Sequence, residues 1–136
     1  MEEILGFNSI SKEKAKQMNA ITLAFVGDAV FSLFVRVKNS LETDLKSGKL
    51  NEKTSSRVCA VAQAEVADAL FPYLTEEETE IFKRGRNAKK PSKSKHSTVV
   101  QYNKSTGLEA LIGYLYLTGD KVRLEYVLNF GDKNES

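Results

Sequence analysis

The sequence has one cysteine, one histidine and no long uncharged apolar run, and each of these facts excludes some kinds of protein or site. Cys59 has no second thiol for an internal disulfide, and its apolar neighbours predict a buried small side chain. His96 lies among lysines, so a serine–histidine catalytic pair has no support. No apolar run reaches about 18 residues without a charge, and the N-terminus lacks the apolar core of a signal peptide. We therefore expect a cytoplasmic protein with no membrane contact.

Acidic residues are absent from the segment between Ile81 and Leu108. That segment carries eight basic residues: Lys83, Arg84, Arg86, Lys89, Lys90, Lys93, Lys95 and Lys104. The rest of the chain has 12 basic against 18 acidic residues, so the net charge of +2 conceals a strongly basic region. Because electrostatic attraction acts locally, this region predicts contact with a polyanion. The alternative is a solvated surface loop, which is the usual state of a run of charges.

The overall composition is that of one globular domain, expected to span residues 1–136. The chain is 41% hydrophobic and 28% charged, which is too apolar for a disordered protein and long enough to bury a core. Helical periodicity of apolar residues dominates, and no alternating strand pattern is present. We expect a short helix after residue 11 and further helices at about 19–38, 51–71, 76–86, 98–117 and 120–129, with a loop at 87–97. The predicted fold class is all-α.

The expected helix at 19–38 is apolar on every side, which predicts a central buried position. A bundle of this length can leave part of such a helix exposed, and a two-fold partner would then cover the remainder. The pattern therefore also predicts a homodimer.

Two of the expected helices each hold a single carboxylate in an apolar run beside a glycine. The strings are LAFVGDAVFSLFVR, with Gly27 and Asp28, and LEALIGYLYL, with Glu109 and Gly113. Glycine inside a helix costs about 1 kcal/mol relative to alanine, so these glycines predict close approach of two backbones. If the helices cross there, Asp28 and Glu109 face each other. Two facing carboxylates repel unless one takes a proton or a cation lies between them.

Mg²⁺ suits such a pair, because it prefers hard oxygen ligands and tolerates a site with few protein ligands and several waters. The alternative is that each acid pairs with a basic side chain, for which Arg36, Lys38 and Arg57 are available. The residues alone leave both alternatives open.

The same strings resemble the ribonuclease III catalytic domain. LAFVGDAVFSLFVR is similar to the signature helix of that family, and LEALIGYLYL is similar to its second acidic helix. FKRGRNAK and STGLEALIGYLYL resemble the short bacterial form, which has no double-stranded-RNA-binding domain. The resemblance covers essentially the whole chain. It implies a homodimeric helical domain that cleaves double-stranded RNA with Mg²⁺ and, in the short form, matures large-subunit (23S) ribosomal RNA.

The resemblance assigns the catalytic and metal-binding roles to Asp28 and Glu109. This chain departs from full-length members of the family, which have further glutamates at the positions of Ile21 and Ala24 and an aspartate at that of Thr106. The short form also lacks these acids. The departures weaken the expectation that protein ligands alone hold two metals tightly.

Without an auxiliary RNA-binding domain, the basic segment is expected to contact RNA phosphates. The candidate residues are Lys83, Arg84, Arg86, Lys89, Lys90, Lys93 and Lys95. Two other functions stay open: a non-catalytic RNA-binding module in ribosome assembly, and a structural helical dimer whose acids pair with arginines. Dependence on a ribosomal protein partner is also left open.

Overall fold

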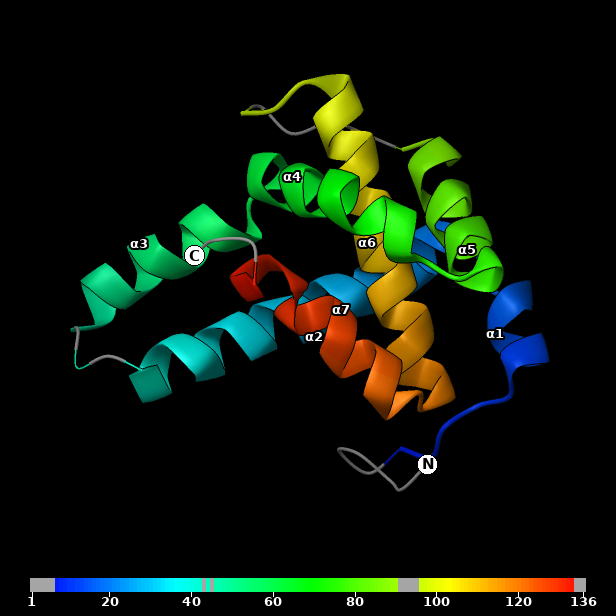
Figure 1. Ribbon diagram of the computed structural model, residues 1–136, viewed down its shortest axis with the longest axis horizontal. Coiled ribbons are helices and arrows are strands. Elements are labelled where there is room, and N and C mark those ends of the chain that lie inside the picture. The colour runs from blue at the N-terminus through cyan, green and yellow to red at the C-terminus, as the bar shows by residue number, and fades with distance from the viewer. Residues whose placement is uncertain (1–6, 43, 45, 91–95, 134–136) are drawn as a thin grey trace.

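The computed structural model describes residues 7–42, 44, 46–90 and 96–133, and their fold confirms the all-α class (Figure 1). The helices in chain order are α1 (Lys12–Gln17), α2 (Ala20–Glu42), α3 (Ser47–Val58), α4 (Ala60–Leu70), the 3-10 turn η1 (Phe71–Tyr73), α5 (Glu76–Asn87), α6 (Val99–Thr118) and α7 (Lys121–Lys133).

Helix α6 is the centre of the domain, because α1, α2, α4, α5 and α7 all pack against it. Between Ser105 and Leu115, every residue of α6 except Glu109 is buried. Apolar side chains therefore surround α6, and the one acid in this stretch lies where the cover is incomplete.

Helix α2 is buried on one face only, so the prediction that it is the central helix is wrong. Its buried residues lie along one side of the helix and are Ala20, Leu23, Ala24, Gly27, Phe31, Val35 and Asn39. The opposite side exposes an apolar stripe made of Phe25, Ala29, Leu33, Val37 and Leu41. The helix is apolar all round in the sequence because both its buried face and its exposed stripe are made of apolar residues. By length and composition, α2 is the one helix of the described residues that meets the criterion for a membrane span, a test that core helices of soluble proteins also pass.

The predicted helix ends are mostly present, because the expected capping groups form their hydrogen bonds. Ser11 caps α1, Asn19 accepts from the backbone of Ile21, and Thr75 and Thr98 each form a reciprocal capping box. Gly119 ends α6 at a φ of 74°, a conformation that favours glycine. Helices α2 and α7 run about one turn further than expected.

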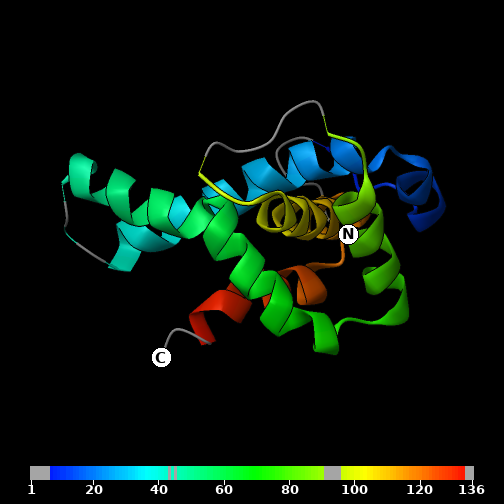
Figure 2. The same cartoon turned by 90° about the horizontal axis from the view of Figure 1, so that it is seen from above.

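The predicted single helix at 51–71 is wrong, because the chain breaks at Cys59 into α3 and α4. Cys59 has an extended backbone (ψ 158°), and its thiol is exposed rather than buried as expected. Helix α3 packs on the end of α2, whereas α4 packs on α6, so the chain must change direction between them. Figure 2 shows α3 and the end of α2 extending away from the body. The break contains no glycine or proline, so the sequence does not signal it.

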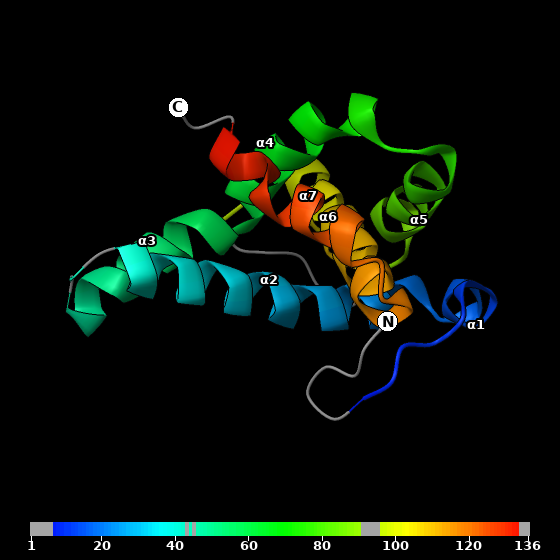
Figure 3. The same ribbon diagram turned by 60° about the horizontal axis from the view of Figure 1, so that its bottom comes forward.

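Helices α2 and α6 cross at the two predicted glycines (Figure 3). A methyl group at Gly27 would collide with the carbonyl oxygen of Glu109, and one at Gly113 would collide with the carbonyl oxygen of Leu23. Both obstacles are backbone atoms, which cannot move aside as a flexible side chain can. The close approach therefore requires glycine at both positions.

We expect Gly27→Ala and Gly113→Ala each to lower the free energy of unfolding by about 1–3 kcal/mol, because the two backbones must separate. Chemical denaturation measures the effect. Gly48→Ala in α3 is the matched control, since nothing lies within 4 Å of the added methyl. This control should gain roughly 0.5–1 kcal/mol from helix propensity. Equal effects at all three glycines would contradict the close crossing.

Candidate active site

The crossing of α2 and α6 brings Asp28 and Glu109 together, as expected from the sequence. Gly27 touches the backbone of Glu109, and Asp28 is the next residue on α2. The carboxyl groups of Asp28 and Glu109 share a hydrogen bond. Asp28 is exposed to solvent and Glu109 is half-buried, so the pair lies at the surface with its deeper member on α6.

Glu109 holds its proton more tightly than an ordinary glutamate. Burial is the main cause, and the hydrogen bond and negative charge of Asp28 act in the same direction, raising the pKa of Glu109 to about 8. A hydrogen bond from Gln63 opposes the shift, because it stabilises the ionised carboxylate. Glu109 therefore favours its protonated form at neutral pH when no cation is bound.

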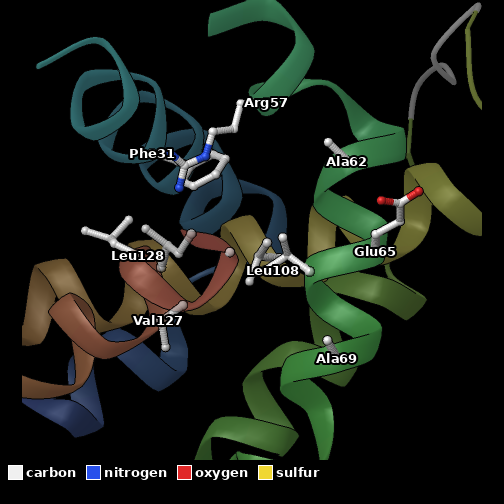
Figure 4. Close-up of a pocket in the computed structure, with 11 residues that line it drawn as sticks. Phe31, Arg57, Ala62, Glu65, Ala69, Leu108, Val127 and Leu128 are labelled. Atoms are coloured by element: carbon white, nitrogen blue, oxygen red, sulfur yellow. The ribbon is translucent and has the colours of Figure 1, made fainter. Parts of the chain in front are cut away.

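None of the basic side chains described forms an ion pair with Asp28 or Glu109. Of the candidates, the Lys38 ammonium donates to the side-chain oxygen of Asn129 at 3.2 Å. Arg57 lies beside a separate cavity, together with Phe31 and Leu108 (Figure 4). The structure therefore gives no support to the alternative in which arginines neutralise both acids.

Two carboxylates that meet without an ion pair to any basic side chain in the described ranges fit a Mg²⁺ ion. Among the described residues, no group of three or more His, Cys, Asp or Glu side chains could supply a fuller ligand set. Mg²⁺ binds through one or two carboxylates and keeps several waters, so Asp28 and Glu109 are sufficient. Thr106 does not add to the pair, because its hydroxyl donates to the carbonyl of Tyr102 in its own helix.

Gln63 on α4 completes this group of side chains, and the sequence analysis missed it. Its amide nitrogen donates to Glu109 Oε2 at 3.3 Å and to the carbonyl of Val58 at 2.7 Å. The available signal was a polar residue on the apolar face of α4, which buries Gln63, Ala64, Ala67 and Leu70. Because one unbroken helix was expected at 51–71, the buried face of α4 was not recognised from the sequence.

A cavity between the helices, shown in Figure 4, is lined by other residues than the two acids. It has a volume of about 290 Å³ and is lined mainly by apolar side chains of α2, α4, α6 and α7, with Arg57 and Glu65 as its charged residues. Neither Asp28 nor Glu109 lines it. The acids thus lie outside the cavity, in a position that suits a large substrate better than a small enclosed one.

The basic segment divides into exposed side chains and side chains that hold the fold. Lys83 and Lys89 are exposed, and Arg86 is half-buried with its guanidinium donating to Asn87. Lys93 and Lys95 lie outside the described residues. The RNA-binding role of these residues stays a prediction.

Arg84 and Lys90 direct their charges to backbone carbonyls. Arg84 donates to the carbonyls of Lys16 and Met18 at 2.9 and 2.7 Å, which ties α5 to the chain before α2. The Lys90 ammonium donates to three carbonyls at the end of α5, and burial lowers the pKa of its side chain. The side chains of Arg84 and Lys90 therefore stabilise the fold through these hydrogen bonds, and a role in RNA binding stays a separate prediction.

Comparison with known proteins identifies the family. The model of the ribonuclease III domain matches residues 21–120, which include both helices of the acidic pair. The chain belongs to the ribonuclease III family. It is 41% identical over 119 residues to Mini-ribonuclease 3 of Clostridium tetani, covering 87% of this chain and 79% of that protein. It is 39% identical over 127 residues to Mini-ribonuclease 3 of Enterococcus faecalis, covering 88% and 96%.

A solved structure agrees with this assignment. The crystal structure of a Fusobacterium nucleatum protein superposes with a TM-score of 0.81 at 30% sequence identity, covering 89% of this chain and 97% of that one. The family resemblance stated from the motifs is therefore confirmed, and so is the ribonuclease III-like helical fold.

The raised pKa of Glu109 predicts a pH-dependent stability in metal-free protein. Between its ordinary value of 4.5 and about 8, the unfolded chain has lost this proton and the folded chain keeps it. The free energy of unfolding should therefore fall as pH rises across this window, by at most about 1.4 kcal/mol per pH unit. Glu109→Gln has no proton to lose and should remove this contribution.

Urea denaturation of parent and variant at pH 5, 6, 7 and 8, with a chelator present, measures the difference. The stability of Glu109→Gln relative to the parent should increase steadily with pH. A constant difference across the four pH values would show that Glu109 ionises normally.

Proposed function

We propose that this chain is a Mg²⁺-dependent endoribonuclease that cleaves double-stranded RNA, with Asp28 and Glu109 as its catalytic, metal-binding residues. The observation that carries the proposal is the contact between these two acids at the glycine crossing, where no basic side chain of the described residues forms an ion pair with either acid. The family and its ribonuclease name supply the reaction class.

Phosphodiester hydrolysis needs an activated water and neutralisation of charge at phosphorus and at the leaving oxygen. Bound Mg²⁺ supplies this chemistry by lowering the pKa of water and polarising phosphate oxygens. Asp28, being exposed, is the carboxylate that approaches the substrate side. Glu109 must release its proton to act as a ligand, and the hydrogen bond from Gln63 favours the ionised form. With two acids only, the substrate phosphate is expected to complete the ligand set, so metal and RNA bind cooperatively.

The RNA-contact surface proposed for this chain is the end of α5 and the residues after it. Double-stranded RNA is held mainly by shape and by phosphate and 2′-hydroxyl contacts. Lys83, Arg86 and Lys89 are the described candidates for phosphate contacts. Arg84 and Lys90 are expected to contribute their positive charge from fixed positions, because their donors already hold backbone carbonyls.

The substrate proposed is the precursor of large-subunit (23S) ribosomal RNA in the cytoplasm. Similarity to proteins named Mini-ribonuclease 3 over most of their length supports the short form of the family. A ribosomal protein that presents this RNA remains a proposed partner.

A homodimer is proposed from the exposed stripe on α2. Phe25 and Leu41 are 80% and 82% exposed, which is unusual for large apolar side chains on a helix that is otherwise core. A two-fold partner would bury the stripe against its own copy, because such an interface is self-complementary. The helical repeat places Asp28 between the stripe and the buried face of α2, so the partner would lie close to the acids.

The first test is cleavage of a long double-stranded RNA by the parent, Asp28→Asn and Glu109→Gln, with and without Mg²⁺. Each substitution keeps the size of the side chain and removes its charge. We expect Mg²⁺-dependent cleavage by the parent and a loss of more than about 100-fold in both variants, because even outer partners of a metal site typically cost 10–100-fold. Product length on a denaturing gel is the readout.

Glu42→Gln is the matched control, because Glu42 is an exposed acid at the far end of the same helix as Asp28. It should cleave as the parent does. A folded parent that binds this RNA and a ribosomal precursor but cuts neither would favour the non-catalytic RNA-binding module.

The dimer is tested by placing a charge in the stripe. We expect the parent to sediment with the mass of two chains and Leu33→Glu to sediment as a monomer, because a buried carboxylate at a two-fold interface meets its own copy. Val122→Glu is the control, since Val122 on α7 is 78% exposed and lies outside the stripe. Sedimentation equilibrium measures the mass and the dimer dissociation constant of each protein. A Leu33→Glu variant that dimerises as tightly as the parent would show that the interface lies elsewhere.

A further inference from the structure

Gln63 is one of the most deeply buried polar side chains of the described residues, with 1% of its surface exposed. It lies in the first turns of α4, on the face that packs against α6. Its amide nitrogen makes two hydrogen bonds, to the carbonyl of Val58 and to Glu109 Oε2. Gln63 therefore connects the break between α3 and α4 to the deeper acid of the pair.

The contact with Val58 decides which way the amide of Gln63 points. A backbone carbonyl only accepts hydrogen bonds, so the group 2.7 Å from the carbonyl of Val58 must be the amide nitrogen. The same nitrogen lies 3.3 Å from Glu109 Oε2. Gln63 therefore acts as a hydrogen-bond donor toward Glu109. The contact holds Glu109 Oε2 on the side of the acid pair that faces α4.

The amide oxygen of Gln63 does not stabilise the fold. Gln63 Oε1 is buried and has no hydrogen-bond partner among the described residues. Leaving a buried carbonyl oxygen unpaired costs free energy, so an apolar side chain of the same size would serve packing as well. The two contacts of the amide nitrogen are thus what distinguishes glutamine from methionine or leucine here.

We propose that Gln63 is a positioning residue for the metal site: it holds Glu109 Oε2, so that the other oxygen, Oε1, is presented toward Asp28. The inference rests on the function proposed above. Metal-binding side chains are generally oriented by such outer hydrogen bonds, and loss of one typically costs 10–100-fold in metal affinity or activity. The break at Cys59 contributes to this arrangement, because it leaves the carbonyl of Val58 in a position to accept a hydrogen bond from the Gln63 amide.

The test compares Mn²⁺ binding, followed by electron paramagnetic resonance, in four RNA-free proteins: the parent, Gln63→Met, Glu109→Gln and the double variant. Methionine keeps the length and volume of glutamine and removes its donor. We expect Gln63→Met to weaken Mn²⁺ binding by about 10–100-fold. In the Glu109→Gln background the same change should have no further effect, because Gln63 acts through Glu109. The Mg²⁺ concentration for half-maximal RNA cleavage should rise in parallel, whereas RNA affinity measured with a chelator and no metal should stay unchanged.

Gln63→Asn provides a second variant if methionine disturbs folding, since it keeps the amide and withdraws it by one methylene. It should show the same loss of Mn²⁺ binding while it still unfolds in a single cooperative thermal transition. Unchanged Mn²⁺ binding in both variants, or equal losses with and without Glu109, would overturn the role of Gln63 alone. If the parent binds Mn²⁺ too weakly without RNA, the Mg²⁺ concentration for half-maximal cleavage carries the same comparison of the four proteins. A parent that neither binds Mn²⁺ nor needs a divalent metal for cleavage would overturn the metal assignment itself and the positioning role with it.

Discussion

The contact between two backbones at Gly27 and Gly113 is the constraint on which the rest of the structure depends. Only there can α2 approach α6 so closely that a carboxylate on each helix reaches the other without long, flexible side chains between them. The crossing fixes how far apart the two backbones lie, and the Gln63 amide contacts the Glu109 carboxylate from a third helix. The geometry of the site therefore depends on the helix crossing as well as on the acids.

The acids are costly in this position, and their cost indicates how the site works. Neither forms an ion pair with a basic side chain of the part of the chain that the structure describes, and burial together with repulsion from Asp28 raises the pKa of Glu109. In the proposed function, Asp28 and Glu109 would hold Mg²⁺, which would relieve the repulsion between them. The small number of acids is the reason why the proposal couples metal binding to substrate binding.

Several elements of this fold were predictable because local rules decide them. The capping residues at 11, 75 and 98 and the glycine at 119 mark helix ends through hydrogen bonds between near neighbours in sequence. The crossing was predictable because glycine in an apolar helix has few other uses. The break at Cys59 was not, since it serves packing on two different helices and leaves the apolar repeat intact. Gln63 and the one-sided burial of α2 were missed for the same reason: both depend on what lies opposite in space.

The exposed thiol at Cys59 gives this molecule a natural attachment point for a probe. The chain has no other cysteine, so a maleimide dye or a nitroxide would attach at one place without any change to the sequence. That place is the joint between α3 and α4, next to the residue whose carbonyl holds Gln63. A label there would sense whether the joint bends when nucleic acid arrives, and would do so in the unaltered protein.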